Sequence, residues 1–219
     1  MEGNSVEHSK TMTDGRHLRS QQTRQKLLEA ARHVFLEEGF QKSTISQIIK
    51  RAKTGYGTAY VHFTGKDDLL IVLMEDVMAA FYSIAELPFF PASKAEAQKM
   101  ILNQTTTFLK MAESERNMLQ VFAEAIGVSS AARQKWTEIR EKFIQRIAQD
   151  ITYSQQNGLA RSDVQPELVA RGWFYAHEMY LWDIVRNEHT VSLDDIAMTL
   201  TAIYTGGLYP SQENPPGMS

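Results

Sequence analysis

His177 and Glu178 are the ionisable pair that most invites a chemical role, because they interrupt a segment otherwise rich in aromatic and aliphatic residues. A charge without a partner in such surroundings is costly, so we expect at least one of the two to have a polar partner or to face a cavity. The helical zinc motif His-Glu-x-x-His is excluded, since Leu181 stands where its second histidine would be.

The residue types of the chain give little support for any other kind of catalytic site. The chain of 219 residues contains no cysteine, which removes thiol nucleophiles, disulfides and thiolate metal sites. Its 6 histidines are scattered, and no serine is framed by the glycines of a nucleophile elbow. The sequence therefore predicts no catalytic residue, no metal and no cofactor. It favours a binding protein over an enzyme.

A second group of polar residues, between Arg16 and Lys66, suggests contact with nucleic acid. This stretch carries ten Lys and Arg against three acidic residues, a net charge of +7, whereas the whole chain has a net charge of −3. Residues 67–219 carry a net charge of −8. A basic module ahead of an acidic body is typical of a protein whose first part faces nucleic acid. On charge alone, a solvated basic surface without a partner remains the alternative.

Helical periodicity places these polar residues on three short elements. One face of the first helix carries four apolar residues, and we expect Gly39 to end that helix as a left-handed cap. A second helix should begin behind the cap Ser43-Thr44 and end near Lys53. A third, short helix should run from Gly55 or Tyr56 to Phe63, whose side chain we expect in the core. This spacing is that of a helix-turn-helix.

One stretch of the sequence resembles a known protein family. The stretch AKTGYGTAYVHFTGKDDLL, residues 52–70, resembles the signature of TetR-family transcriptional regulators. The matching positions are Gly57, Thr58, Tyr60, Phe63, Lys66, Asp68 and Leu69. The upstream stretch from Thr23 to Ile48 resembles the first helix of that family and its link to the second. The similarity covers residues 23–73.

The resemblance implies an all-α fold, with an N-terminal three-helix helix-turn-helix DNA-binding domain followed by a larger helical ligand-binding and dimerisation domain. Three positions depart from the family pattern. Lys53 replaces the turn glycine, Gly55 the usual serine cap, and Tyr56 the usual Lys or Arg at the tip of the recognition helix. Because tyrosine cannot donate twice to guanine, we expect less dependence on G·C pairs at that step.

We predict DNA contacts along the third helix and its flanks. The N-terminal half of a recognition helix enters the major groove, so Tyr56 and Thr58 should lie nearest the bases, with hydroxyl, imidazole and ammonium groups on phosphates. A solvent-facing Tyr56 and a core-packed Tyr60 are the alternatives. The predicted DNA-binding residues are Thr44, Gly55, Tyr56, Gly57, Thr58, Tyr60, His62 and Lys66.

The rest of the chain reads as long helices with short breaks. We predict them at about 66–86, 92–112, 115–127, 130–157, 166–188 and 192–205, separated by Gly, Pro and Asn residues. The predicted domains are a disordered N-terminal tail (1–18), the DNA-binding domain (19–66), the ligand-binding and dimerisation domain (67–206) and a flexible C-terminal tail (207–219).

The large apolar residues of this body predict both a pocket and a dimer interface. Methionine and aromatic side chains suit an adaptable pocket, although plain core packing is the alternative for each of them. The predicted pocket residues are Phe108, Met111, Met118, Phe122, Trp136, Phe143, Trp173, His177, Glu178 and Tyr180. The last two long helices resemble the four-helix dimer interface of the family, through Leu181, Val185, Leu193, Ile196, Leu200 and Ile203.

These features together predict a homodimeric, ligand-responsive regulator. We expect a repressor that binds a palindromic operator in double-stranded DNA and leaves it when an apolar or aromatic small molecule binds. The alternative is an architectural DNA-binding protein that needs no ligand and has a collapsed body cavity. No aliphatic run is long enough for a membrane span and the start of the chain is polar, so we expect no membrane partner and a cytoplasmic location.

Overall fold

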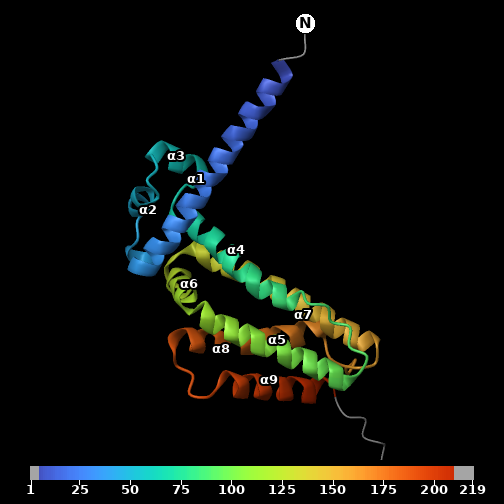
Figure 1. Ribbon diagram of the computed structural model, residues 1–219. Helices are drawn as coiled ribbons and strands as arrows, with labels where there is room; N and C mark the ends of the chain where they lie inside the picture. The colour runs from blue at the N-terminus through green and yellow to red at the C-terminus, as the bar shows by residue number, and fades with distance from the viewer. Residues whose placement is uncertain (1–4, 210–219) are drawn as a thin grey trace, which may run out of the picture. The chain divides into compact units, whose positions relative to one another are not determined.

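The computed structural model describes residues 5–209, with side chains described from His17 onward. Those residues form helices and no strands, in agreement with the predicted all-α class (Figure 1). The helices are α1 (Ser5–Lys42), α2 (Ile45–Ala52), α3 (Tyr56–His62), α4 (Lys66–Ala85), α5 (Lys94–Ser114), α6 (Arg116–Val128), α7 (Ser130–Gln156), α8 (Pro166–Arg186) and α9 (Leu193–Leu208). The predicted helix ends agree with these bounds to within a few residues, except at the N-terminus. Within the described residues, no helix is both long and apolar enough to cross a membrane.

Backbone contacts divide the chain into two compact units. The first unit is Met1–Asp76 with Val121–Arg133, and the second is Val77–Gln120 with Gln134–Ser219. The divisions fall inside α4, α6 and α7.

In the first unit, α1 packs against both α2 and α3. The face of α1 predicted to be apolar is buried, as are the inward residues of α2 and α3, and Phe63 is a core residue as predicted: Leu27, Ala31, Val34, Phe35, Ile48, Ile49, Ala59 and Phe63. Gly39 breaks α1 with φ 76° and ψ 167°. Its φ is positive as predicted, but its ψ is extended and not left-handed helical, and the chain makes one more helical turn to Lys42.

In the second unit, α5 packs against α8 and α9. Pro166 occupies the first turn of α8, where its missing N–H costs no hydrogen bond, and Asn187 closes the helix in the left-handed conformation. Ser192 caps α9 by accepting from the N–H of Asp195 at 3.1 Å. Good caps at α8 and α9 explain why sequence patterns located both helices well.

The two predicted tails differ from the structure where it describes them. Residues 5–18, expected to be disordered, belong to α1. This stretch contains no proline, so a helix nucleated on the packed part of α1 extends into it at little cost. At the other end, α9 runs past residue 207 to Leu208, and the buried Tyr209 follows it, because both side chains find apolar contacts. The remaining tail residues, 1–4 and 210–219, lie outside the described part of the chain.

Candidate DNA-binding surface and ligand cavity

The turn between α2 and α3 is held by local polar contacts. The hydroxyl of Thr44 accepts from the N–H of Gln47 at 3.3 Å, and the Gln47 side chain accepts from the N–H of Thr44 at 2.7 Å, a capping box that starts α2. Lys53 ends α2 in the left-handed conformation, with φ 53° and ψ 42°. Gly55 is the N-cap of α3 and has no side chain to cap it. The turn thus presents the start of α3 at the surface.

Helix α3 is a short helix anchored through one side. Ala59 is buried in its middle, while the side chains around it are exposed: Tyr56 by 56%, Tyr60 by 49% and Val61 by 80%. The exposure of Tyr60 excludes the core-packed alternative. A Cβ added at Gly57 would meet nothing within 4 Å, so the fold itself does not require glycine there. An open glycine on an exposed helix leaves room for the close approach of a partner.

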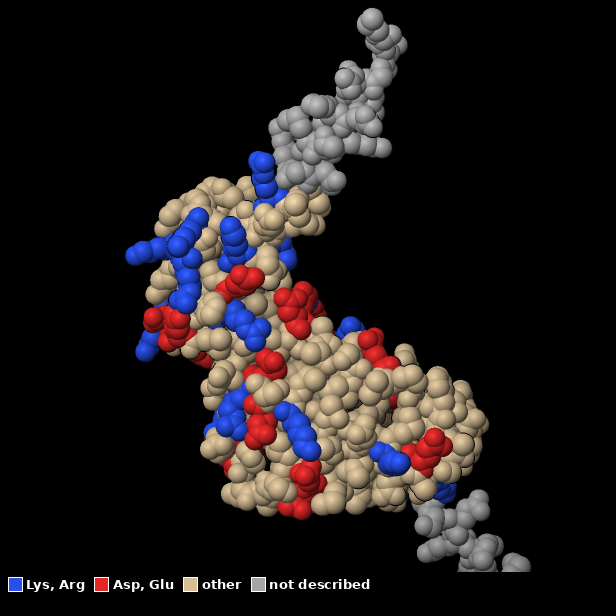
Figure 2. Space-filling model, viewed as in Figure 1, with Lys and Arg blue, Asp and Glu red and all other residues tan. Residues whose placement is uncertain are grey.

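Basic side chains surround this helix in the first unit. Figure 2 shows Lys and Arg side chains gathered over the part of the chain that contains α1, α2 and α3. Exposed ones include Arg24, Lys42, Lys50, Arg51 and Lys53. Arg51 also pairs with Glu37 at 2.6 Å. Predicted contact residues and basic groups therefore occupy the same unit.

Lys66 has a role different from the predicted phosphate contact. Its ammonium group donates to the carbonyl oxygens of Phe40 at 2.7 Å, Ser43 at 2.9 Å and Gln41 at 3.3 Å. It also lies over the ring of Phe40, 4.4 Å from the centroid. An ammonium group has three hydrogens, so these three carbonyls use its donor capacity. We therefore correct the prediction: Lys66 holds the chain between α1 and α2.

Glu124 is a residue of this region that sequence reasoning missed. Its carboxylate accepts from the N–H of Phe40 at 2.8 Å and the N–H of Gln41 at 2.9 Å, directly after the break at Gly39. A Cβ at residue 39 would lie 2.8 Å from its Oε2, which accounts for glycine at that position together with the positive φ. Nothing in the local pattern around residue 124 signals a contact 84 residues away.

The second unit contains a cavity of about 80 Å³. Side chains from α4, α5, α7, α8 and α9 and from the segments that follow α4 and α9 line it: Phe81, Ile84, Ala85, Phe89, Ile101, Gln104, Thr105, Phe108, Phe143, Ile147, Asp150, Trp173, Phe174, His177, Tyr204 and Tyr209. Most are apolar or aromatic, as in small-molecule sites generally. The lining is therefore that of a hydrophobic ligand site with a few polar groups.

Four of the predicted pocket residues line this cavity, namely Phe108, Phe143, Trp173 and His177. The other six lie outside its lining: Met111, Met118, Phe122, Trp136, Glu178 and Tyr180. Met118 and Phe122 are fully buried core residues, and Trp136 and Glu178 bond to each other. Sequence reasoning also missed several aromatic wall residues, Phe81, Phe89, Phe174, Tyr204 and Tyr209, because helical periodicity shows which residues are buried but not which of them leave space between them.

His177 is a neutral, fully bonded side chain of the cavity wall. Its Nδ1 lies 2.9 Å from the carbonyl oxygen of Trp173, which can only accept, so Nδ1 carries the hydrogen. Its Nε2 lies 3.2 Å from the hydroxyl of Thr105. Burial lowers the pKa of His177 to about 4. The prediction that this residue has a polar partner or faces a cavity is confirmed on both points.

A cluster around Asp150 forms another polar part of the lining. Burial raises the pKa of the Asp150 carboxyl to about 6, against the opposing effect of its ion pair with Arg146. For Tyr204, burial first, then Tyr209 and Asp150, raises the pKa well above 10.0. The hydroxyl of Tyr209 lies 3.0 Å from that of Ser154. The tyrosines therefore stay protonated at neutral pH.

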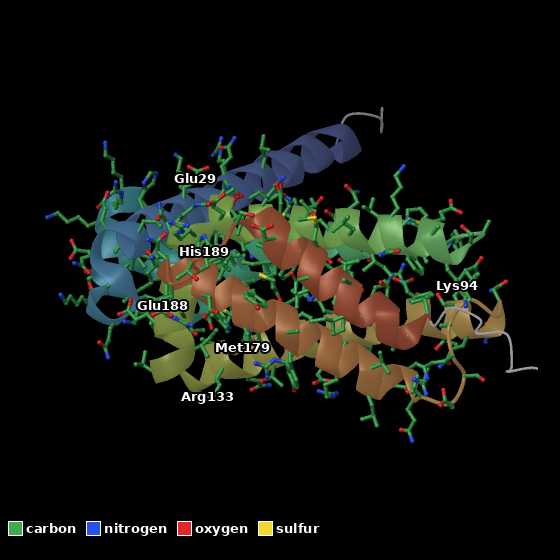
Figure 3. All side chains as sticks on the ribbon, turned by 90° about the horizontal axis from the view of Figure 1, so that it is seen from below. Glu29, Lys94, Arg133, Met179, Glu188 and His189 are labelled. Atoms are coloured by element: carbon green, nitrogen blue, oxygen red, sulfur yellow. The ribbon has the colours of Figure 1, made fainter. Side chains whose placement is uncertain are left out.

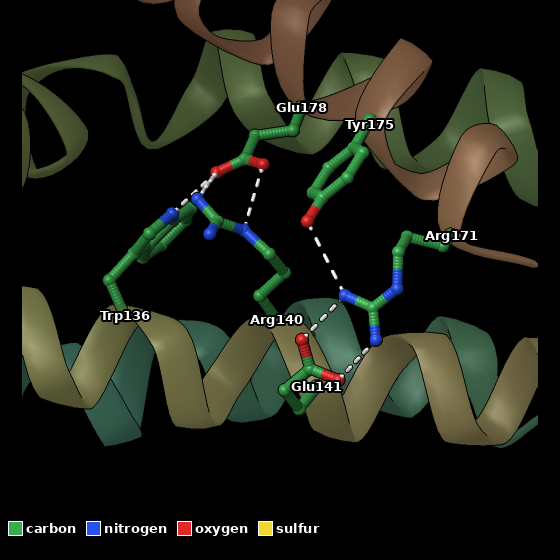
Figure 4. A network of polar contacts seen from close by, with 6 residues as sticks. All are labelled: Trp136, Arg140, Glu141, Arg171, Tyr175 and Glu178. Atoms are coloured by element: carbon green, nitrogen blue, oxygen red, sulfur yellow. Dashed lines mark hydrogen bonds and ion pairs between the residues drawn. The ribbon is translucent and has the colours of Figure 1, made fainter. Parts of the chain in front are cut away.

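Glu178 belongs to a separate polar network between α7 and α8 (Figure 4). Its carboxylate accepts from the indole N–H of Trp136 at 2.5 Å and from the guanidinium of Arg140 at 2.8 and 3.0 Å. Beside it, Arg171 makes a two-bond contact with Glu141 at 2.7 and 2.8 Å. Glu178 thus has the polar partners expected of it, and it serves to join two helices.

The surface of α8 and α9 differs from the predicted dimer interface in its residues. Leu181, Val185, Ile196 and Leu200 are buried within the chain, Leu193 is half-buried, and Ile203 is 70% exposed. The exposed apolar side chains of these helices are Leu168, Tyr175, Met179, Met198 and Ile203. Figure 3 looks onto α8 and α9, which lie side by side, and labels Met179. The period of each helix was predicted correctly, but the buried stripe faces the chain's own core.

The sequence of the first unit is similar to that of known proteins. Residues 27–73 match the sequence model of the family described as bacterial regulatory proteins, tetR family. Over 184 residues, the chain is 23% identical to the fatty acid metabolism regulator protein of Bacillus subtilis (strain 168), covering 84% of this chain and 94% of that protein.

Two solved structures show the same fold over most of both chains. A SmeT–triclosan complex has a TM-score of 0.70 at 18% identity and covers 90% of this chain and 96% of its own. The transcriptional regulator FadR from Bacillus subtilis, in complex with stearoyl-CoA, has a TM-score of 0.68 at 20% identity and covers 84% and 98%. The helical fold of most of the chain, and not only of α1 to α3, is thus shared with these two solved structures.

Proposed function

Because residues 27–73 match the sequence model of the tetR family of bacterial regulatory proteins, we propose that this chain is a homodimeric, ligand-responsive transcriptional repressor. In this proposal α3 reads a palindromic operator, and an apolar or aromatic small molecule in the second unit releases the protein from DNA. The observation that carries the proposal is the coincidence of the family match with an exposed, tyrosine-bearing α3 among basic side chains. Such a repressor acts on the chromosome, in the cytoplasm.

The DNA contact is assigned to α3 and the N-terminus of α2. Tyr56, Gly57 and Thr58 form the exposed first turn of α3, the part of a recognition helix that approaches base edges. Gly55 precedes this turn, and Tyr60, His62 and Thr44 stand at positions suited to phosphates. We add Val61 to the predicted set, because an exposed aliphatic side chain on this helix can contact a thymine methyl group.

Selection of sites from random duplex DNA, followed by fluorescence anisotropy, tests this assignment. We expect an enriched palindrome, and we expect Tyr56→Ala to change the preference at one base step by about 1–3 kcal/mol. Arg161→Ala is the matched control, because it removes an exposed charge from the second unit. If Tyr56→Ala weakens selected and random duplexes equally, Tyr56 does not read bases.

The dimer is assigned to the exposed faces of α8 and α9. Leu168, Tyr175 and Met179 repeat at intervals of seven and four residues on α8, and Met198 and Ile203 extend the apolar surface on α9. A large exposed apolar patch is typical of an association surface. A two-fold dimer would present two α3 helices about one duplex turn apart, ~34–36 Å, or somewhat more, which is why a palindrome is expected.

Sedimentation velocity at micromolar concentration tests the dimer. We expect a dimer for the native chain and a monomer for Met179→Asp with Ile203→Asp. Val61→Asp, which changes an equally exposed aliphatic residue on α3, is the control and should remain dimeric. A monomeric native chain would overturn the assignment.

Ligand-driven release is assigned to the cavity of the second unit. A ligand needs only to favour one arrangement of the helices around the cavity, and a differential affinity of ~2–3 kcal/mol shifts the DNA equilibrium about a hundredfold. The relatives named above are solved with an apolar phenolic compound and with an acyl-CoA, and both serve as probes here. We expect at least one of triclosan and stearoyl-CoA to displace operator DNA from the native protein.

The cavity variants separate ligand response from folding. Trp173→Ala should remove the response to the displacing probe and leave ligand-free DNA binding nearly intact, because Trp173 stacks on Tyr204 in the cavity wall at 4.1 Å between centroids. Phe90→Ala is the control, since Phe90 is an exposed aromatic residue of the same unit. Loss of DNA binding and of thermal stability together in Trp173→Ala would mean that Trp173 is core.

A further inference from the structure

The hydrogens of two hydroxyl groups in the cavity lining are already used inside the protein. The hydroxyl of Ser154 donates its only hydrogen to the carbonyl oxygen of Asp150, 3.0 Å away. Tyr209, 3.0 Å from the same hydroxyl oxygen, must therefore be the donor in that contact. Tyr209 is a lining residue, and its hydroxyl has only acceptor capacity left for a ligand.

The hydroxyl hydrogen of Thr105 is also used inside the protein. Since Nδ1 of His177 donates to the carbonyl of Trp173, Nε2 of the neutral ring carries a lone pair. Thr105, 3.2 Å away, donates its hydroxyl hydrogen to that nitrogen. Thr105 is therefore also an acceptor toward the cavity, and His177 has no hydrogen left to offer.

Asp150 is the charged group of the lining. Its Oδ1 pairs with Arg146, and its Oδ2 contacts no donor among the described residues. No Lys or Arg belongs to the lining, and the guanidinium of Arg146 is used by Asp150 and by the carbonyl oxygen of Leu87 at 3.4 Å. A ligand carboxylate in this cavity would face a carboxylate and find no free cation.

Three lining groups keep donor hydrogens. The hydroxyl of Tyr204 and the indole N–H of Trp173 donate to no acceptor within the described part of the chain, and Gln104 makes only a long contact of 3.5 Å, to the carbonyl oxygen of Ile84. A ligand hydroxyl can both donate to Asp150 and accept from a neighbouring tyrosine, and thereby matches both kinds of group.

The remaining walls are aromatic. Phe108 lies edge-on to both Phe81 and Phe143, with centroids 5.2 and 6.4 Å apart, and Phe143 stacks on Phe174 at 5.5 Å. Edge and face contacts of this kind accept a further aromatic ring well. An engineered cavity of ~150 Å³ holds benzene. This cavity of about 80 Å³ is smaller, and widening on binding would give a ligand a way to move the helices.

We propose that the cavity selects an aromatic ligand that presents a hydroxyl or amino hydrogen to Asp150, and that it rejects carboxylates of the same shape. This inference rests on the proposed function only in taking the cavity to be the effector site. It names the class of the effector: phenols and amines that carry an aromatic ring, and not acids.

Four probes on one carbon frame test the proposal with the full-length protein and no DNA. They are para-butylphenol, its methyl ether para-butylanisole, para-butylbenzylamine and para-butylbenzoic acid, with binding measured by calorimetry. We expect the phenol to bind about tenfold or more tighter than the ether, and the amine about tenfold or more tighter than the acid. An ether or an acid that binds as tightly as its partner overturns the proposal, and so does the absence of saturable binding by all four.

Two variants locate the preference at Asp150. Asp150→Asn should remove most of the preference for the amine over the acid, because the amide carries no charge and presents donors of its own. Asp163→Asn is the control, since Asp163 is an exposed acid of the same unit that pairs with Arg161 at 2.6 Å. Unchanged selectivity in Asp150→Asn overturns the role of Asp150, and the native probe series tests the ligand class without any variant.

Failure here and failure of the proposed function give different results. If an acid binds the cavity and displaces operator DNA, the chain is a ligand-responsive repressor but the present proposal is wrong. If the ligand-free protein selects no operator, the repressor proposal fails, and the probe series still decides the chemistry of the cavity.

Discussion

Two sets of polar contacts, one in each unit, are built in different ways. In the first unit, Glu124 and Lys66 bond to backbone groups of residues 40–43: the carboxylate accepts from two N–H groups and the ammonium donates to three carbonyls. At two places in the second unit the partners of a buried side chain are other side chains: Glu178 bonds to Trp136 and Arg140, and Thr105 to His177.

This difference separates a fixed element from an adjustable one. Charges that bond to backbone fix the path of the chain at the break after Gly39 and hence the start of α2, whatever the surrounding side chains do. Side-chain pairs fix only the distance between two helices, and those at the cavity can be exchanged for contacts with a ligand. A fixed α2–α3 turn in one unit and an adjustable cavity in the other suit a protein in which ligand changes the arrangement of helices and not the reading surface itself.

The largest effect is expected when a side-chain pair of the second unit loses one member. Glu178→Ala leaves the indole N–H of Trp136 without an acceptor and Arg140 without its carboxylate, so we expect a loss of about 3–4 kcal/mol in the free energy of unfolding. Urea unfolding followed by tryptophan fluorescence measures it. The matched control is Glu141→Ala, which removes the half-exposed partner of Arg171 and should cost much less. Equal losses would contradict the distinction between buried and exposed pairs.

The next largest effect concerns the pH dependence of the free energy of unfolding, to which two residues of the cavity make opposing contributions. His177 has its pKa lowered to about 4, so its contribution is present above pH ~6.5 and is lost as pH falls toward 4. Asp150 has its pKa raised to about 6, so its contribution is present below pH ~3.8 and is lost as pH rises through 6. The two contributions have opposite signs over nearly the same range, each on the order of 3 kcal/mol.

Asp150→Asn should expose this compensation. Relative to the native chain, we expect the variant to lose about 2–3 kcal/mol of additional stability between pH 6.5 and pH 4, since the His177 contribution then stands alone. His177→Asn should show the reverse, a relative gain on acidification. Unfolding free energies at a series of pH values measure both. Parallel pH profiles for the native chain and Asp150→Asn would show that Asp150 does not titrate in this range.

The same contrast between units explains what the sequence could predict. Thr44, Gly55 and the Lys53 turn lie within a dozen residues of one another, so local caps and spacing determine α2 and α3, and the motif could be recognised as a unit. The contacts of Lys66 reach back to Phe40, 26 residues away, and those of Glu124 reach 84 residues, so their roles depend on tertiary packing that no local pattern contains.

In the second unit, Pro166, Asn187 and Ser192 punctuate the chain clearly enough to place α8 and α9. The roles of their apolar residues are harder to predict, because α8 is apolar on most of its faces. Periodicity cannot tell which face meets the chain's own core, which borders a cavity and which stays exposed. That is why Leu181 and Leu200 were predicted as interface residues and are buried instead.

A smaller effect is expected from the backbone clamp of the first unit. Lys66→Met removes the donor to three carbonyls but keeps much of the packing on Phe40, so we expect a loss of about 2 kcal/mol in stability. If Lys66 has a structural role, the folded variant should bind DNA with the same salt dependence as the native chain. A phosphate contact predicts that the slope of log K against log salt falls by ~1. Anisotropy at several salt concentrations therefore distinguishes the two roles of Lys66.

The smallest effect compares the two left-handed residues, Lys53 in the first unit and Asn187 in the second, with φ 53° and 59°. For a residue with a Cβ this conformation costs roughly 1–2 kcal/mol, whereas asparagine tolerates it and glycine adopts it freely. Glycine also has more freedom to lose on folding, which offsets part of the gain. We therefore expect Lys53→Gly to raise the unfolding free energy by about 0.5–1 kcal/mol and Asn187→Gly to change it by a few tenths at most. Urea unfolding of both variants measures the difference.

Because Lys53 is exposed and basic in the proposed DNA-binding unit, the Lys53→Gly substitution should weaken operator binding while it stabilises the fold. A Lys53→Gly variant that is more stable and binds DNA as well as the native chain would show that the family's turn glycine was replaced here without a gain in DNA contact.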